Sequence, residues 1–329
     1  MRDFQFTSTR TVPDALTAAG TDRQGRFIAG GTCLLDLMKL DVETPERLID
    51  IHRLQLEEIT ETADGGVRIG AMARNSAVAY HPLIRERYPL LSDAILSGAS
   101  PQLRNMATVG GNLLQRTRCT YFRDVHWACN KRVPGSGCAA QEGHHRNHAI
   151  FGTSEACFAT HPSDMCVALL ALEATVEIEG ATGKRRVGAE DFHRLPGDTP
   201  DVETVLEPGE LITAVEVPRT AAGWRARYEK VRDRASYEFA LVSVGAMLDF
   251  REGRIQQVRV AFGGVGTKPW RAAEVETLLT GKAAAPELFR EAAEVAVREA
   301  APRRDNRFKV KLLKRTVVRT LEDLTGVMS

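Results

Sequence analysis

The sequence predicts an α+β protein built from three consecutive units. The first observation is length: 329 residues are too many for one compact core, so two or three domains are expected. The second is periodicity, because stretches with the two-residue period of strands alternate with helical stretches along the chain. We place the units at residues 1–55, 56–218 and 219–329.

The composition is that of an ordinary globular protein. Hydrophobic residues make up 43% and charged residues 26%, and the formal net charge is +1. This balance gives no case for binding nucleic acid or a charged membrane surface. No apolar run approaches the ~20 residues that span a membrane. The N-terminal residues lack the apolar segment of a secretion signal, so we expect any export to depend on a partner that carries one.

The first unit contains a strand, a glycine turn and a helix in succession. Phe27 and Ile28 suit a strand, Gly30 and Gly31 a tight turn, and residues 34–38 begin a helix. This order directs free backbone N–H groups at phosphate oxygens. It is equally typical of an ordinary turn without a ligand, and it is not a GxGxxG fingerprint. A helix at 11–20 and a strand at 47–51 complete the unit.

The second unit begins with a hairpin, residues 56–62 and 67–71 around a turn at 64–66. Helical patterns follow at 75–88, with a break at His81-Pro82, and at 90–97. After a long irregular stretch, further elements are predicted as a helix at 164–174 and strands at 175–179, 185–192 and 210–217.

The third unit predicts three strands followed by three helices. The strands are expected at 224–231, 239–250 and 255–262, and the helices at 272–280, 286–300 and 307–324. The last helix has an apolar stripe formed by Val310, Leu313, Val317, Leu321 and Leu324. Its basic residues suit a solvated face, or alternatively contact with an acidic partner subunit.

A second glycine turn, Thr108-Val-Gly-Gly-Asn112, lies in a different unit from the first. A large dinucleotide bridging two units would use both turns, with its pyrophosphate at the first. Thr108 and Asn112 would then reach polar atoms of its chain or ring. Asp164 and Lys230 could hold the far edge of the ring. Asp164 is also a candidate helix N-cap, and Lys230 a candidate solvated charge.

Four cysteines lie in the irregular stretch between this turn and residue 164: Cys119, Cys129, Cys138 and Cys157. Four thiolates suit a cubane iron–sulfur cluster. The spacing contains no CxxC pair, but nearby histidines keep a mixed Cys/His zinc site open, as well as disulfides or unligated thiols. Cys33 stands apart, and Cys166, in an apolar helical run, is expected to be a buried core thiol.

Five segments occur in the order typical of one family: 29–39, 104–113, 162–165, 209–218 and 228–234. With them the chain resembles, over nearly its whole length, the FAD-binding subunits of the xanthine dehydrogenase and carbon monoxide dehydrogenase class of molybdenum hydroxylases. The resemblance implies an α+β fold: a two-subdomain FAD-binding domain of the vanillyl-alcohol-oxidase (PCMH) type, then a smaller α+β C-terminal domain.

The resemblance also implies the residues that contact FAD. Phe27 to Leu35 would wrap the pyrophosphate, and residues 107–112, 164, 211–212 and 230 would contact the flavin or its chain. The implied contact residues are Phe27, Ile28, Ala29, Gly30, Gly31, Thr32, Cys33, Leu34, Leu35, Ala107, Thr108, Gly111, Asn112, Asp164, Leu211, Ile212 and Lys230. The family often has Asp or Asn where Cys33 stands, and its paired acidic residues are replaced by Tyr237-Glu238, for which we infer no role.

The cysteine-bearing insertion, residues 115–160, resembles that of bacterial periplasmic aldehyde oxidoreductases. It implies a [4Fe-4S] cluster held by the four cysteines. It further implies a heterotrimer, in which a molybdopterin-binding large subunit oxidises an aldehyde. The [2Fe-2S] clusters of a small subunit would pass electrons through FAD here to an external acceptor. No catalytic residue is identified in this chain, because the flavin carries the chemistry.

Two other functions stay open at this stage. A 4-hydroxybenzoyl-CoA reductase-like subunit would handle CoA thioesters, and a zinc-stapled assembly subunit would bind no flavin. The expected compartment is the periplasm, reached with a signal-bearing partner, or alternatively the cytoplasm.

Overall fold

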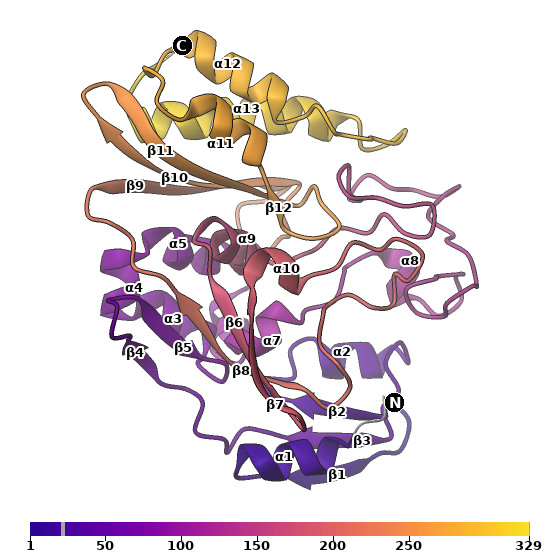
Figure 1. The fold of residues 1–329 in the computed structure, drawn as a ribbon. Helices are drawn as coiled ribbons and strands as arrows, with labels where there is room; N and C mark the ends of the chain where they lie inside the picture. The colour runs from indigo at the N-terminus through magenta and orange to yellow at the C-terminus, as the bar shows by residue number, and fades with distance from the viewer. Residues whose placement is uncertain (21–23, 329) are drawn as a thin grey trace.

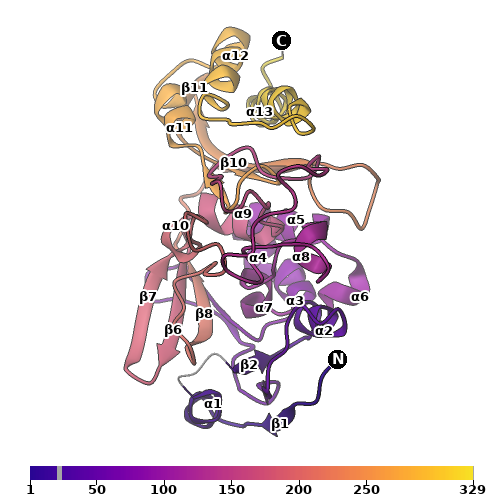
Figure 2. The same cartoon turned by 90° about the vertical axis from the view of Figure 1, so that its right-hand side faces the viewer.

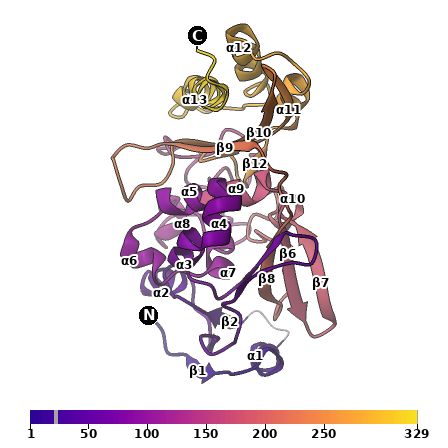
Figure 3. The same cartoon turned by 90° about the vertical axis from the view of Figure 1, so that its left-hand side faces the viewer.

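The computed structural model describes residues 1–20 and 24–328, and it contains three sheets stacked along the long axis of the molecule (Figure 1). The N-terminus lies in the lower lobe and the C-terminus at the top, in the first view and in both turned views (Figures 2 and 3). Helices and strands are mixed throughout, which confirms the predicted α+β class. The positions of the domain boundaries stay a prediction.

The lowest sheet is parallel, with strand order β1-β3-β2. Helix α1 starts after Thr11, whose hydroxyl accepts a hydrogen bond from the Asp14 N–H, and ends at Gly20. The sequence missed β1 because all four of its residues are exposed and show no alternation. The elements of this lobe are β1 (Gln5–Ser8), α1 (Val12–Ala19), β2 (Gly25–Ile28), α2 (Leu34–Lys39) and β3 (Arg47–Asp50).

The middle sheet has the order β4-β5-β8-β6-β7 and is antiparallel. The predicted hairpin is present, and the alternating burial of β6 matches its sequence pattern. Its strands are β4 (Ile59–Glu61), β5 (Val67–Gly70), β6 (Thr175–Gly180), β7 (Gly183–Gly188) and β8 (Leu211–Val217).

Helices cover this sheet and form the largest core with it. The predicted break at Pro82 separates α3 from α4, and every residue of α9 is buried. Residues 185–192 are divided between β7 and a short helix. The helices of this region are α3 (Asn75–Tyr80), α4 (Pro82–Arg87), α5 (Pro89–Ser97), α6 (Pro101–Arg104), α7 (Val109–Leu113), α9 (Asp164–Ala171) and α10 (Ala189–Phe192).

The upper sheet, of order β12-β11-β10-β9, lies between the middle helices and three C-terminal helices (Figure 1). Four of the five predicted stripe residues of α13 are buried against it, and Val310 is half-buried. The elements are β9 (Trp224–Val231), β10 (Val242–Arg251), β11 (Arg254–Gly263), β12 (Trp270–Arg271), α11 (Ala273–Leu279), α12 (Pro286–Val295) and α13 (Phe308–Thr325).

The cysteine loop, residues 115–160, contains one short helix, α8 (Thr120–Arg123), and otherwise turns and isolated bridges. It is held by its neighbours at both ends. Phe122 and Cys129 pack on Leu37 of α2, and Phe151 stacks on Trp270 at 5.3 Å between ring centroids. The loop therefore joins the lowest lobe to the C-terminal sheet. Among the described helices, none is long and apolar enough to cross a membrane.

Candidate cofactor site

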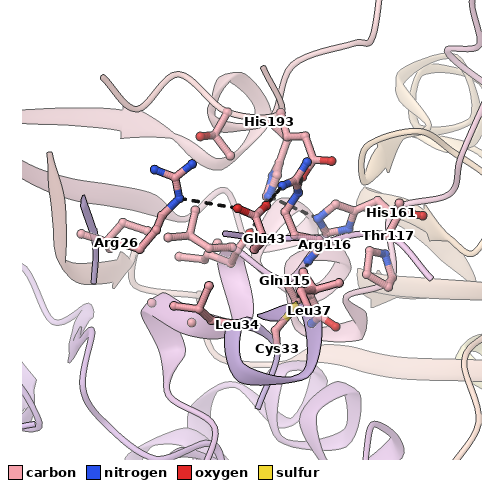
Figure 4. Close-up of a pocket in the computed structure, with 18 of the residues that line it drawn as sticks. Arg26, Cys33, Leu34, Leu37, Glu43, Gln115, Arg116, Thr117, His161 and His193 are labelled. Atoms are coloured by element: carbon pink, nitrogen blue, oxygen red, sulfur yellow. Dashed lines mark hydrogen bonds and ion pairs between the residues drawn. The ribbon is translucent and has the colours of Figure 1, made fainter. Parts of the chain in front are cut away.

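The main cavity, of about 350 Å³, lies where the two predicted glycine turns meet (Figure 4). The first turn links β2 to α2, and the second leads into α7. A Cβ at Gly30 would collide with the carbonyl oxygen of Met106, so the two turns touch only because residue 30 is glycine. Gly31 has φ +67°, the left-handed region that glycine adopts without strain.

The second turn is a short helix rather than an open turn. Thr108 is the N-cap of α7, with its hydroxyl accepting a hydrogen bond from the Gly111 N–H at 3.2 Å. Glycine has low helix propensity, which hid this element from the sequence. The Asn112 side chain points away from the cavity, because its Oδ1 accepts hydrogen bonds from Ser163 Oγ and Gln115 Nε2, both at 2.6 Å.

Most residues that the resemblance implies for FAD line this cavity. They come from both turns and from β8, so three segments far apart in sequence form one wall. The implied residues on the lining are Phe27, Ala29, Gly30, Gly31, Thr32, Cys33, Leu34, Thr108, Gly111, Leu211 and Ile212. The implied residues that lie outside the lining are Ile28, Leu35, Ala107, Asn112, Asp164 and Lys230.

Asp164 and Lys230 bind each other. The Lys230 ammonium lies 2.8 Å from Asp164 Oδ2, and both side chains are at least nine-tenths buried. The Tyr228 hydroxyl donates to Asp164 Oδ1 at 2.7 Å, and burial raises the Tyr228 pKa well above its usual value. Two bland interpretations were therefore wrong: Lys230 is not solvated, and the N-cap of α9 is Ser163, whose hydroxyl accepts from the Cys166 N–H.

A buried chain of charges that the sequence did not reveal borders the cavity. Arg116 pairs with Glu43 and with Glu203, the latter at 2.9 Å, and Lys131 pairs with Glu203 at 2.7 Å. Arg26 lies 3.8 Å from Glu43 (Figure 4). Burial alone would raise the pKa of Glu203, but the charges of Arg116 and Lys131 lower it overall.

Two histidines of the same cavity face each other. His161 Nε2 lies 3.2 Å from His193 Nε2, which is also 3.0 Å from the Leu113 carbonyl (Figure 4). Burial lowers the pKa of His193 to about 4, so its ring is neutral near pH 7. With the buried Cys166 thiol they form the only group of three Cys, His, Asp or Glu ligand atoms within 4.8 Å in the described part of the chain.

The four loop cysteines surround one small pocket beside the main cavity. All six cysteines of the chain are free, and Cys166 is a core thiol as predicted. Burial raises the pKa of Cys119 to about 12 and also raises the pKa of Cys138 and Cys157, so these thiols are protonated without a metal. Lys131, Cys157 and Ala159 line both the pocket and the cavity, so the two spaces share a wall.

The chain matches two family models in succession. Residues 2–220 match the FAD binding domain in molybdopterin dehydrogenase, and residues 226–324 match the CO dehydrogenase flavoprotein C-terminal domain. The fold, the glycine-lined cavity and these matches define a flavoprotein subunit of an oxidoreductase. The chain belongs to the FAD-binding medium subunits of the molybdenum hydroxylase family.

Particular relatives are similar over nearly the whole length. The aldehyde oxidoreductase FAD-binding subunit PaoB of Escherichia coli is 50% identical, covering 98% of each chain. The glyceraldehyde dehydrogenase medium chain of Sulfolobus acidocaldarius is 30% identical, over 93% of this chain and 91% of its own. The carbon monoxide dehydrogenase structure from Hydrogenophaga pseudoflava superposes with a TM-score of 0.78 at 27% identity, over 99% and 98% of the chains.

Proposed function

We propose that this chain is the FAD- and [4Fe-4S]-binding electron-transfer subunit of a molybdenum-containing aldehyde oxidoreductase. The observation that carries the proposal is the shared wall between two sites. One is a cavity built from both glycine turns, and the other is a pocket surrounded by four free cysteines. The name of the 50% identical relative, an aldehyde oxidoreductase FAD-binding subunit, supports the substrate class.

The cavity fits FAD in its residue types. The close approach of Gly30 to the second turn leaves backbone groups, rather than side chains, along the narrow part of the cavity. Arg26 and Arg116 provide positive charge beside the first turn, which suits a pyrophosphate. Leu211 and Ile212 provide an apolar wall for a ring system. Bound FAD would supply the redox chemistry, and the chain would hold and orient it.

The cysteine pocket fits an iron–sulfur cluster better than a single zinc ion. Thiolates on one zinc ion lie about 3.8 Å apart, given a Zn–S distance of about 2.3 Å and tetrahedral geometry. The four cysteines surround one pocket, yet no three of their ligand atoms meet the 4.8 Å limit within the described residues. Wider spacing suits four irons that each take one thiolate. Metal binding would deprotonate thiols whose pKa burial now raises.

We further propose a heterotrimer with a molybdopterin-binding large subunit and a [2Fe-2S] small subunit. Electrons would enter from the small subunit and leave FAD for an external acceptor. The Lys131, Cys157 and Ala159 wall supports short-range contact between the [4Fe-4S] and FAD sites. The periplasm, reached with a signal-bearing partner, is the proposed compartment, with the cytoplasm as the alternative.

The purified complex tests the proposal through its absorption spectrum and its content of FAD, iron, acid-labile sulfide and zinc. We expect flavin bands on a broad iron–sulfur shoulder, one FAD, and about four irons in this chain beyond those of the small subunit. A colourless complex that contains zinc would instead support the assembly-subunit alternative. Reduction of an aromatic CoA thioester by reduced ferredoxin, without aldehyde oxidation, would support the CoA-thioester alternative.

A further inference from the structure

One histidine of the cysteine loop lies directly against a predicted cluster ligand. His148 lines the cysteine pocket, and its Nε2 lies 3.2 Å from Cys119 Sγ. Its side chain is only 6% exposed. None of the implied cofactor contacts includes this residue, and its position among the ligands therefore calls for its own account.

The surroundings of the ring determine which nitrogen carries the proton. The Nδ1 of His148 is buried without a hydrogen-bond partner, so Nε2 makes the ring's polar contact. A thiolate that binds iron has no proton of its own and can only accept a hydrogen bond. The tautomer that satisfies this contact has its proton on Nε2, where it points at the sulfur of Cys119.

The ring is held in this orientation from two sides. It packs at a tilt on Phe158, with 4.9 Å between centroids, and lies 6.3 Å from Tyr121. The backbone carbonyl of His148 accepts a hydrogen bond from Asn306, which is fully buried just before α13. The imidazole is therefore fixed by the loop and by the C-terminal domain together, as a positioned donor requires.

Other histidines of the loop have different partners. His126 is mostly exposed and binds the Asp124 carboxylate at 2.8 Å, while His145 Nδ1 lies 3.7 Å from Asp305. Among the described histidines of the loop, His148 is the one that lines the cysteine pocket. The contact is therefore specific to one ring, and His126 offers a matched control.

We propose that His148 is a positioning residue for the iron–sulfur cluster, and that its Nε2–H donates a hydrogen bond to Cys119 Sγ. The inference rests on the proposed function, because it requires that Cys119 bind the cluster. Reduction adds negative charge to the cluster and its sulfurs, and an N–H donor stabilises that charge. His148 therefore raises the reduction potential of the cluster and fixes the rotamer of one ligand.

Redox titration of the purified complex, monitored by EPR, tests this. In His148→Leu the donor is lost, so the cluster potential shifts to a more negative value. In His148→Gln an amide N–H replaces the donor, so the potential stays close to that of the wild type. His126→Leu has no effect. An unchanged potential in His148→Leu, with full iron and sulfide content, would overturn the inference.

A second measurement applies if His148→Leu loses the cluster. Pulsed EPR on wild-type complex labelled with ¹⁵N-histidine should detect a weak nitrogen coupling to the reduced cluster, absent in His148→Gln. No histidine coupling would contradict the hydrogen bond, and a strong one would identify His148 as a direct ligand instead. A wild-type complex with no iron beyond that of the small subunit would overturn the proposed cluster and, with it, this inference, and metal analysis identifies that failure beforehand.

Discussion

The main cavity and the cysteine pocket are neighbours that are built in opposite ways. The cavity takes its shape from regular elements, since a strand, two helix starts and β8 bring its residues together. The cysteine pocket lies in a loop whose regular structure amounts to one four-residue helix. Its walls are held by packing at the two ends of the loop.

This difference indicates what each site requires to keep its form. Hydrogen-bonded strands and a packed core hold the cavity whether or not a ligand is present. The loop has few such interactions, so a bound cluster would provide cross-links that the backbone does not. Loss of the cluster should therefore disturb the loop while leaving the cavity intact, and loss of FAD should do the reverse.

The largest expected effect follows from removing one thiol. We predict that Cys129→Ser loses the [4Fe-4S] cluster, because a buried serine hydroxyl is a poor replacement for a thiolate. Iron in the complex should fall by about four per chain, while FAD content stays close to that of the wild type. Metal and flavin analyses of the same sample provide the measurement.

Cys166→Ala is the matched control, because that thiol is equally buried but lies outside the cysteine pocket. It should retain its iron. Full iron and sulfide in Cys129→Ser would show that the ligand assignment is wrong.

The second largest effect concerns the contact between the glycine turns. In Gly30→Ala the new methyl group meets the backbone of Met106, so the turns must separate. Overpacking of this kind costs about 1–3 kcal/mol, which corresponds to roughly a tenfold or greater loss of FAD affinity. Flavin content should fall and iron should remain. Gly188→Ala, where the methyl group meets nothing closer than 3.9 Å, should retain its flavin.

A third prediction separates scaffold from cofactor contact at Lys230. Lys230→Met leaves the Asp164 carboxylate buried without its ion pair, and such a loss costs about 3–5 kcal/mol. A lower urea midpoint should therefore accompany little change in FAD affinity. Lys184→Met, at an exposed pair, should change neither. If FAD affinity falls and stability does not, Lys230 contacts the flavin as the family resemblance implies.

The smallest expected effect is on the pH dependence of stability. The pKa of His193 is lowered to about 4 in the folded chain, against about 6.5 when unfolded. The unfolded chain therefore binds the extra proton between these values, and stability falls as the pH drops from about 6.5 to 4. One such group contributes at most about 1.4 kcal/mol per pH unit. His193→Phe should flatten this slope in urea titrations, and an unchanged slope would contradict the assignment.

Local patterns in the sequence predicted most of the elements. The alternation of β6, the break at Pro82 and the stripe on α13 each appear in the structure where periodicity placed them. Both glycine turns were found for the same reason, since glycine marks a backbone position that tolerates no side chain. These signals are short in range and need no knowledge of tertiary contacts.

The remaining features depend on residues far apart in the chain. The ion pair of Arg116 with Glu203 and the contact of His148 with Cys119 join segments that carry no periodic pattern. Asp164 looked like an N-cap because it precedes an apolar run, but Ser163, one residue earlier, has the hydroxyl in position. Neighbouring polar residues compete for such a role, and only geometry decides between them.

The central claim is that an iron–sulfur cluster and FAD lie on the two sides of the wall formed by Lys131, Cys157 and Ala159. Diffraction data from crystals of the complex, collected on both sides of the iron and zinc absorption edges, test it most directly. We predict an iron anomalous peak surrounded by Cys119, Cys129, Cys138 and Cys157, with FAD density in the adjacent cavity. A zinc peak at that position, or no anomalous peak there, would contradict the account.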